Sequence, residues 1–320
     1  RQIMIKRKMI LILLFSYIYS ETLFFGSFGH SLKNSIINNY NTESTLGYNN
    51  ARDIMYSQVD IKQGNQLECV YSGYTITLDL SQDPSTDAFE KGINCEHTWP
   101  QSMGSSSEPM KSDMHHLFPT KSNVNSSRGN DPFDESNDTL TDKWYRGDTY
   151  IQYIPTSNID EYAEKYNPPN SEDERFEPRE IQKGDTARAM AYFYTMYSNA
   201  ADVNFWEIQK NILSDWNYLD PPSEKEISRT WAIATFQDNL PNPFVIDHTL
   251  FDRIYFWEMI AKGDINVDRS LDVLDIVSMT NLIVNSSILS NELLYITDIN
   301  LDDGLNVIDI VSYINIITGI

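Results

Sequence analysis

The sequence predicts an α+β protein that ends in a small all-α domain. Three observations carry this prediction. Residues 67–80 alternate β-branched and aromatic side chains, as the two strands of a hairpin would. Residues 183–199 and 224–237 repeat apolar side chains at helical spacing. An internal repeat, which differs in composition from everything before it, occupies residues 264–284 and 298–318.

The composition is that of an acidic globular protein. Of the 320 residues, 41% are hydrophobic and 22% are charged, which allows a sizeable core. A net charge of −22 disfavours a protein that holds nucleic acid by positive charge alone. It still allows an enzyme that acts on nucleic acid through a bound cation.

The N-terminus has the pattern of an export signal. Basic residues at 6–8 precede an apolar run at 9–19 that is short for a bilayer span. We expect residues 1–29 to be a signal peptide, which implies a secreted, cell-surface or periplasmic protein without a membrane span after cleavage. An uncleaved membrane anchor is the alternative.

Two cysteines, Cys69 and Cys95, stand in the chain. In an exported protein such a pair invites a disulfide. Two buried free thiols are the alternative, because sequence does not give the distance between the two residues.

The larger domain is expected at residues 30–262. Residues 91–97 form a second strand pattern, after the hairpin. Residues 101–137 consist mostly of turn-forming residues, and a loop of this length is a candidate functional segment. Asp185 is expected to cap the first of the two helices.

The C-terminal repeat predicts two calcium loops. Oxygen-bearing side chains fall at loop positions 1, 3, 5, 9 and 12, and position 7 offers a backbone carbonyl. This is the spacing of an EF-hand-like loop, which wraps oxygen ligands around Ca²⁺, although Asp replaces the usual Glu at position 12. The expected ligands in the first loop are Asp264, Asn266, Asp268, Ser270, Asp272 and Asp275. In the second loop they are Asp298, Asn300, Asp302, Gly304, Asn306 and Asp309.

Each loop is followed by a helix with an apolar stripe. Neither helix has a core of its own, so we expect the two helices to pack together and calcium binding to be coupled to their folding. Residues 263–320 carry nine acidic residues and one arginine. A merely solvated acidic tail is the alternative interpretation.

Residues 263–320 resemble dockerin domains, which carry two such loop–helix repeats and dock onto cohesin partners. The resemblance implies two structural Ca²⁺ ions and a cohesin-like or cell-surface partner. Loop positions 10 and 11, through which dockerins choose partners, hold Val273–Leu274 and Val307–Ile308 instead of small hydroxyl residues. Attachment to the cell surface or sorting is therefore a competing role for this module, beside cohesin binding.

The stretch "CEHTWPQS" at 95–102 raises the question of a second metal site. A zinc interpretation would use Cys95, His97, His115 and His116 as ligands. No CxxC, HxH or HExxH spacing is present, and neighbouring residues of a strand point to opposite faces, which disfavours zinc. The residues alone do not decide whether these histidines belong to a functional site.

Four segments resemble the endonuclease I family in sequence and order: "NCEHTWPQS", "SDMHHLFPTKSNVNSSRGNDPF", "KGDTARAMAYFYTMY" and "LPNPFVIDH". The similarity runs from about residue 50 to about residue 258. It implies a secreted or periplasmic nuclease with a ββα-metal (His-Me finger) core surrounded by helices. It also implies endonucleolytic cleavage of DNA, with RNA as a further substrate, leaving 5′-phosphates.

The resemblance assigns roles to individual residues. Glu96 and Asn125 match the positions that hold Mg²⁺, for which Mn²⁺ or Ca²⁺ can substitute. His97 matches the general base, and a neutral imidazole suits that task near neutral pH. Arg128 matches an arginine that would clamp a phosphate, and His115 matches a histidine that orients the finger. His116 is a weaker candidate for the same support.

The sequence thus predicts a secreted, Mg²⁺-dependent and largely non-specific endonuclease with a dockerin-like calcium module. Two other interpretations stay open. One is a catalytically inactive scaffold or nucleic-acid-binding protein displayed through its C-terminal module. The other is a zinc hydrolase that acts on a different substrate.

Overall fold

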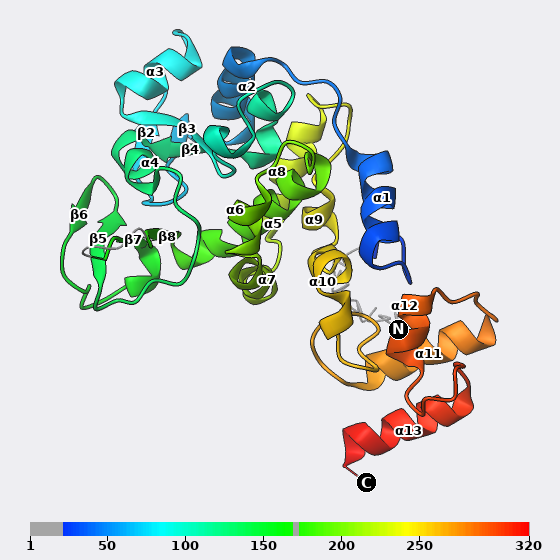
Figure 1. Ribbon diagram of the computed structural model, residues 1–320. Coiled ribbons are helices and arrows are strands. Elements are labelled where there is room, and N and C mark those ends of the chain that lie inside the picture. The colour runs from blue at the N-terminus through cyan, green and yellow to red at the C-terminus, as the bar shows by residue number, and fades with distance from the viewer. Residues whose placement is uncertain (1–21, 169–172, 320) are drawn as a thin grey trace, which may run out of the picture.

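The computed structural model describes residues 22–168 and 173–319. Figure 1 shows a larger body of helices and small sheets, from which α10 (Leu250–Tyr255) leads into a group of three C-terminal helices. The α+β class is confirmed. Most of the predicted signal segment lies outside the described residues, and that segment stays a prediction.

A β–β–α unit forms one part of the larger body. Strand β3 (Ile93–His97) pairs antiparallel with β4 (Leu117–Lys121), and helix α4 (Ser122–Arg128) follows at once. The helix contacts both strands. It ends at Gly129, whose φ of 60° lies in the left-handed region that glycine adopts without strain.

The prediction of a single long loop at 101–137 is therefore wrong, because this segment contains β4 and α4. The predicted hairpin is present as β1 (Gln66–Glu68) and β2 (Thr75–Thr77). A further antiparallel sheet, with strand order β6-β5-β7-β8, was not predicted. Its strands are β5 (Thr141–Arg146), β6 (Thr149–Ile151), β7 (Ala163–Tyr166) and β8 (Arg175–Glu177).

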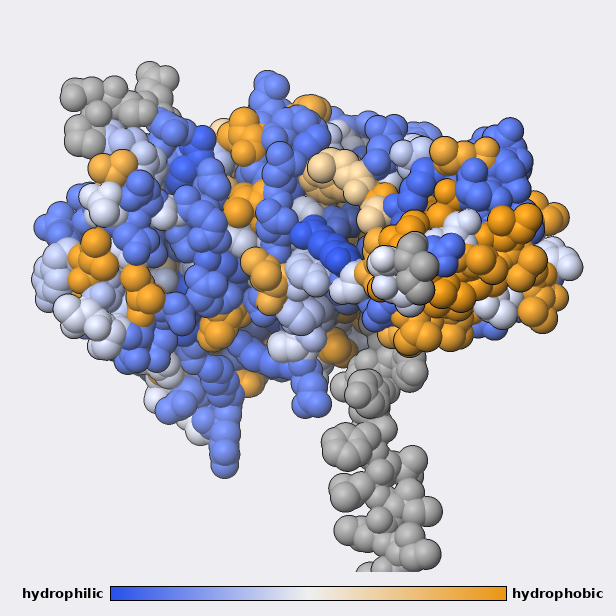
Figure 2. All heavy atoms as spheres, turned by 90° about the horizontal axis from the view of Figure 1, so that it is seen from below, coloured by the Kyte–Doolittle hydropathy of each residue, from blue (hydrophilic) through white to orange (hydrophobic). Residues whose placement is uncertain are grey.

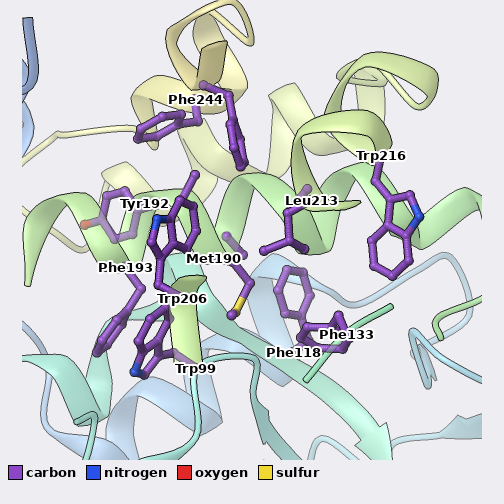
Figure 3. Packing of buried hydrophobic residues seen from close by; sticks show 14 of the residues in the cluster. Trp99, Phe118, Phe133, Met190, Tyr192, Phe193, Trp206, Leu213, Trp216 and Phe244 are labelled. Atoms are coloured by element: carbon purple, nitrogen blue, oxygen red, sulfur yellow. The ribbon is translucent and has the colours of Figure 1, made fainter. Parts of the chain in front are cut away.

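Helix α5 (Lys183–Met196) forms the middle of the core, and almost all of its side chains are buried. Its Phe193 stacks on Trp99 with the ring centroids 4.9 Å apart, in a cluster of large aromatic side chains that Figure 3 shows. The helix begins two residues before Asp185, so Asp185 lies in the first turn and does not cap it.

The other helices of the larger body surround α5. Gly184 at the start of α5 lies so close to the end of α7 (Lys210–Leu219) that a Cβ atom would come within 1.9 Å of the Asp220 carbonyl oxygen. The remaining α-helices are α1 (Gly29–Tyr40), α2 (Tyr48–Ile54), α3 (Pro84–Glu90), α6 (Val203–Glu207), α7 (Lys210–Leu219), α8 (Glu224–Ala234) and α9 (Pro243–Ile246).

The C-terminal unit has three helices, of which two were predicted. Helices α11 (Val273–Val284) and α13 (Val307–Thr318) contact each other, and α12 (Asn291–Thr297) lies between them in sequence. A small core holds them together; its buried members are Phe28, Ile265, Val267, Met279, Leu282, Leu293, Ile296 and Tyr313.

Much of the apolar stripe on α11 and α13 remains on the surface. Figure 2 shows a continuous apolar area over the C-terminal unit. The face that the helices bury in the small core carries Met279, Leu282 and Tyr313, and part of the stripe also packs against that core, namely Ile276, Ile310 and Ile317. The exposed large apolar residues on the two helices are Val273, Leu274, Val277, Val284, Val307, Ile308, Val311, Ile314 and Ile316.

The N-terminal part of the described chain, residues 22–29, packs against this end of the molecule. Arg253 on α10 donates to the carbonyl oxygens of Leu23, Phe24 and Ser27. Among the described residues no helix is long and apolar enough to cross a membrane.

Candidate active site

Glu96 lies near the end of β3 with its carboxylate buried. The Tyr71 hydroxyl donates to Glu96 Oε1 at 3.0 Å, and Arg128 Nη1 lies 3.4 Å from the same oxygen. Within the described ranges no protein donor bonds Oε2, so this oxygen remains for a ligand. Burial raises the pKa of Glu96 to about 7, while Arg128 and Tyr71 act to lower it.

His97 follows directly, and its imidazole is held in one tautomer. Its Nε2 lies 3.0 Å from the carbonyl oxygen of Lys111. A carbonyl only accepts, so Nε2 carries the proton and Nδ1 carries the lone pair. Burial, aided by His116, lowers the pKa of His97 to about 3, so the ring is neutral.

In the part of the chain that the structure describes, the lone pair of Nδ1 has only a weak partner. The Gln101 side-chain amide nitrogen lies 3.5 Å from Nδ1, at the limit of a hydrogen bond. The ring also packs against Tyr48 and His116, with centroids 5.4 Å and 5.5 Å away. The imidazole is therefore fixed in orientation and able to accept a proton.

Asn125, in the middle of α4, turns its amide oxygen away from the strand. Its Nδ2 donates to Asn94 Oδ1 at 2.9 Å and to the Cys95 carbonyl at 3.0 Å. Both partners are acceptors, so the amide nitrogen must face them. The opposite atom, Oδ1, has no protein donor in the described residues and is available as a metal ligand.

Arg128 lies beneath the site and not on its surface. It is 1% exposed, and it donates to the carbonyl oxygens of His97 at 3.3 Å and Thr98 at 2.7 Å. Together with its ion pair to Glu96, these bonds fix the end of β3. This placement favours a positioning role over the predicted contact with a phosphate.

The structure places His116, and not His115, against His97. The ring of His115 packs on Tyr192, and its Nε2 bonds the Leu240 carbonyl at 2.9 Å. Its backbone N–H donates to Asp113, the carboxylate that also accepts from Tyr192, Tyr197 and Gln237. His115 thus ties the 3-10 turn before β4 to the helical core, as a finger-orienting residue would.

Two further residues of the site, Tyr71 and His116, were assigned no role or only a weak one from sequence. Tyr71 belongs to the turn of the predicted hairpin, and no local pattern connects it with Glu96. His116 has a signal, the doubled histidine of "MHH", but sequence does not show which of the two rings faces His97.

The zinc interpretation gains no support from the geometry. The Nε2 atoms of His97, His115 and His116 each face a different backbone carbonyl. Among the described residues no three His, Cys, Asp or Glu side chains converge as a ready metal site. Cys69 and Cys95 are buried free thiols, so the disulfide is absent, and burial raises the pKa of Cys95 to about 12.

The two C-terminal loops follow the same backbone path. In each loop the carboxylate at position 1 accepts a hydrogen bond from the backbone N–H at position 6. The donors are Arg269 in the first loop and Asp303 in the second. Positions 4 and 6 have positive φ in both loops. The position-12 carboxylates, Asp275 and Asp309, accept from the N–H after position 1 at 2.9 Å. The ligand set required for Ca²⁺ would combine these carboxylates with amide and backbone oxygens.

Comparison with known proteins assigns the larger domain to a family. The model of the family described as endonuclease I matches residues 28–249. An extracellular ribonuclease of Bacillus subtilis (strain 168) is 27% identical over 241 residues, which cover 70% of this chain and 73% of that protein. An extracellular ribonuclease of Bacillus amyloliquefaciens is 29% identical over 173 residues, 48% of this chain and 50% of that protein. The chain therefore belongs to the endonuclease I family, whose members are nucleases.

Proposed function

We propose that the protein is a secreted endonuclease that hydrolyses phosphodiester bonds with the help of a divalent cation. The observation that carries the proposal is the pair Glu96–His97 at the end of β3. One side chain is a carboxylate with a free oxygen, and the other is a neutral imidazole with its lone pair at Nδ1. This combination suits hydrolysis through an activated water.

His97 is the general base in this proposal. Its Nδ1 takes a proton from a water molecule as the water oxygen attacks the phosphorus. The Lys111 carbonyl, which holds Nε2–H, stabilises the imidazolium that forms. The bond to the 3′ oxygen breaks, and that oxygen takes a proton from solvent. The product keeps a 5′-phosphate.

Glu96 and Asn125 fit a hard cation such as Mg²⁺. A carboxylate oxygen and an amide oxygen, each without a protein donor, are the donor chemistry that Mg²⁺ selects, with water completing the shell. A bound cation would supply Lewis-acid stabilisation of charge on the phosphate. Tyr71 and Arg128 hold the Glu96 carboxylate in place for it.

Both RNA and DNA are proposed substrates. The family resemblance implies DNA, whereas the names of the two Bacillus relatives favour RNA. A ββα finger places its residues on one phosphodiester and does not require a particular base. We therefore propose a largely non-specific enzyme, and the same names favour its export from the cell.

For the C-terminal unit we propose a dockerin-like calcium module. One support is that the backbone follows the same path in its two loops. A second support is that the Asp264 and Asp275 carboxylates lie close together, so that burial and the Asp275 charge raise the pKa of Asp264 to about 7. The exposed apolar face of α11 and α13 would meet a cohesin-like or cell-surface protein.

Cleavage assays on the purified chain test the main proposal. Supercoiled plasmid and a structured RNA are incubated with the protein in Mg²⁺, and in parallel with EDTA. We expect cleavage of at least one substrate in Mg²⁺ and none in EDTA, with 5′-phosphate ends. Intact substrates under both conditions would favour the inactive scaffold, and stoichiometric zinc would favour the zinc hydrolase.

A further inference from the structure

We propose that Tyr48, Arg52 and Lys111, here called the Tyr48 cluster, bind a backbone phosphate of the nucleic acid that neighbours the scissile one. The proposal rests on the proposed function, because it assigns a substrate subsite beside His97. It assigns the recognition of substrate to residues that lie outside the Glu96–Asn125 pair.

The geometry brings two cations onto one aromatic ring next to the candidate base. The guanidinium carbon of Arg52 lies 4.6 Å from the centroid of the Tyr48 ring, and Lys111 Nζ lies 5.1 Å from it. The same ring lies 5.4 Å from the ring of His97. Tyr48 and Arg52 belong to α2, whereas Lys111 comes from the 3-10 turn Met110–Ser112, so the fold assembles the cluster from separate segments.

Among the described residues, neither positive charge has a carboxylate partner. No ion pair within 4.0 Å is found for Arg52 or Lys111 in the described part of the chain. Arg52 donates to the neutral amide oxygen of Asn49 at 2.9 Å. Glu108, three residues before Lys111, accepts from Ser112 and Thr45. In a chain with a net charge of −22, two unpaired cations beside the site are a feature that an anionic substrate would explain.

The cluster is also connected to the orientation of the base. The backbone carbonyl of Lys111 holds His97 Nε2, while its side chain reaches the Tyr48 ring. All three members of the cluster are partly exposed, so a strand can reach them. A phosphate held by Arg52 and Lys111 would therefore fix the strand relative to the same segment that fixes the imidazole. Such contacts carry charge and geometry but no base sequence, as a non-specific nuclease requires.

Salt-dependent binding tests this subsite apart from cleavage. In the His97→Ala background, fluorescein-labelled single-stranded RNA and DNA are titrated at several KCl concentrations in Mg²⁺, and anisotropy gives the affinity. The double change Arg52→Gln with Lys111→Gln should reduce the slope of log affinity against log salt by about 0.7, because each phosphate of a single strand that a protein neutralises accounts for that much of the slope, and the two cations share one phosphate. The affinity should fall equally for unrelated sequences.

Lys33→Gln is the matched control. Lys33 on α1 also lies over an aromatic ring, 4.9 Å from the centroid of Tyr194, and belongs to a different part of the molecule. It should leave the slope unchanged. The inference is overturned if the double variant keeps the parental slope, or if the parent binds neither oligonucleotide. A wild type that does not cleave, together with a reduced slope in the double variant, would instead overturn the proposed function and keep the subsite.

Discussion

Replacing Arg128 separates a buried positioning role from direct contact with substrate. The Arg128 side chain is 1% exposed, and its guanidinium bonds the carbonyls of His97 and Thr98 and pairs with Glu96 at 3.4 Å. Arg128→Ala would leave Glu96 as a buried carboxylate without its cation. Breaking a buried pair by removing one partner costs about 3–5 kcal/mol.

Arg128→Lys should be intermediate. A lysine keeps the charge near Glu96 but lacks the planar fork that serves two carbonyls and a carboxylate together. We expect a loss of about 1–3 kcal/mol, since one or two buried acceptors lose their donor. Urea unfolding followed by tryptophan fluorescence, in EDTA, measures both free energies without any contribution from a bound cation.

The two roles give different results in these measurements. A positioning residue predicts that stability and cleavage fall together, in the order wild type, Arg128→Lys, Arg128→Ala. A residue that only clamps phosphate predicts unchanged unfolding free energy with a raised KM. Destabilisation of less than about 1 kcal/mol in Arg128→Ala would refute the reasoning from burial and hydrogen bonds.

Three further predictions concern other parts of the molecule. Arg269→Ala should loosen the C-terminal unit from α7 and α10, because Arg269 pairs there with Asp215 and Asp252. Faster proteolysis between the two domains would show this loosening. The control is Asp303→Ala, which changes the same position of the second loop. Burial and the facing Glu177 raise the pKa of Glu164 to about 8, so the stability of the protein should fall as pH rises from about 4.5 to 8. In thermal unfolding, Glu164→Gln should raise the unfolding free energy by about 1 kcal/mol at pH 8 and change it little at pH 5. Removing Ca²⁺ with EGTA should lower the melting temperature of the C-terminal unit and leave that of the nuclease domain nearly unchanged, as calorimetry would resolve.

Local periodicity carried the correct structural predictions. The β1–β2 hairpin, strand β3 and helix α5 each have a pattern that repeats within the element itself. Strand β4 and helix α4 were not recognised from composition, because α4 consists mostly of Ser and Asn and because Pro119 stands in the middle of the five residues of β4. They are held by tertiary contacts, such as the pairing of β4 with β3 and the bond from the N–H of Ser122 to the carbonyl of Gly92, the residue before β3.

The candidate site was predictable only where side chains are adjacent in sequence. Glu96 and His97 stand side by side, and the family resemblance singled them out. Tyr71 reaches Glu96 across 25 positions of the chain, and only the fold shows this. The burial of Arg128 is likewise a tertiary fact, since the sequence does not say whether an arginine faces the substrate or the core.

The role of His97 as general base is tested most directly by comparing His97→Ala with the wild type. Initial rates of RNA and DNA cleavage are measured in Mg²⁺ for both proteins and for His30→Ala, which changes an exposed histidine on α1. With equal folding shown by circular dichroism, we predict that His97→Ala loses about 10²–10⁴-fold in rate and that His30→Ala keeps the wild-type rate. A His97→Ala rate close to that of the wild type would contradict the mechanism.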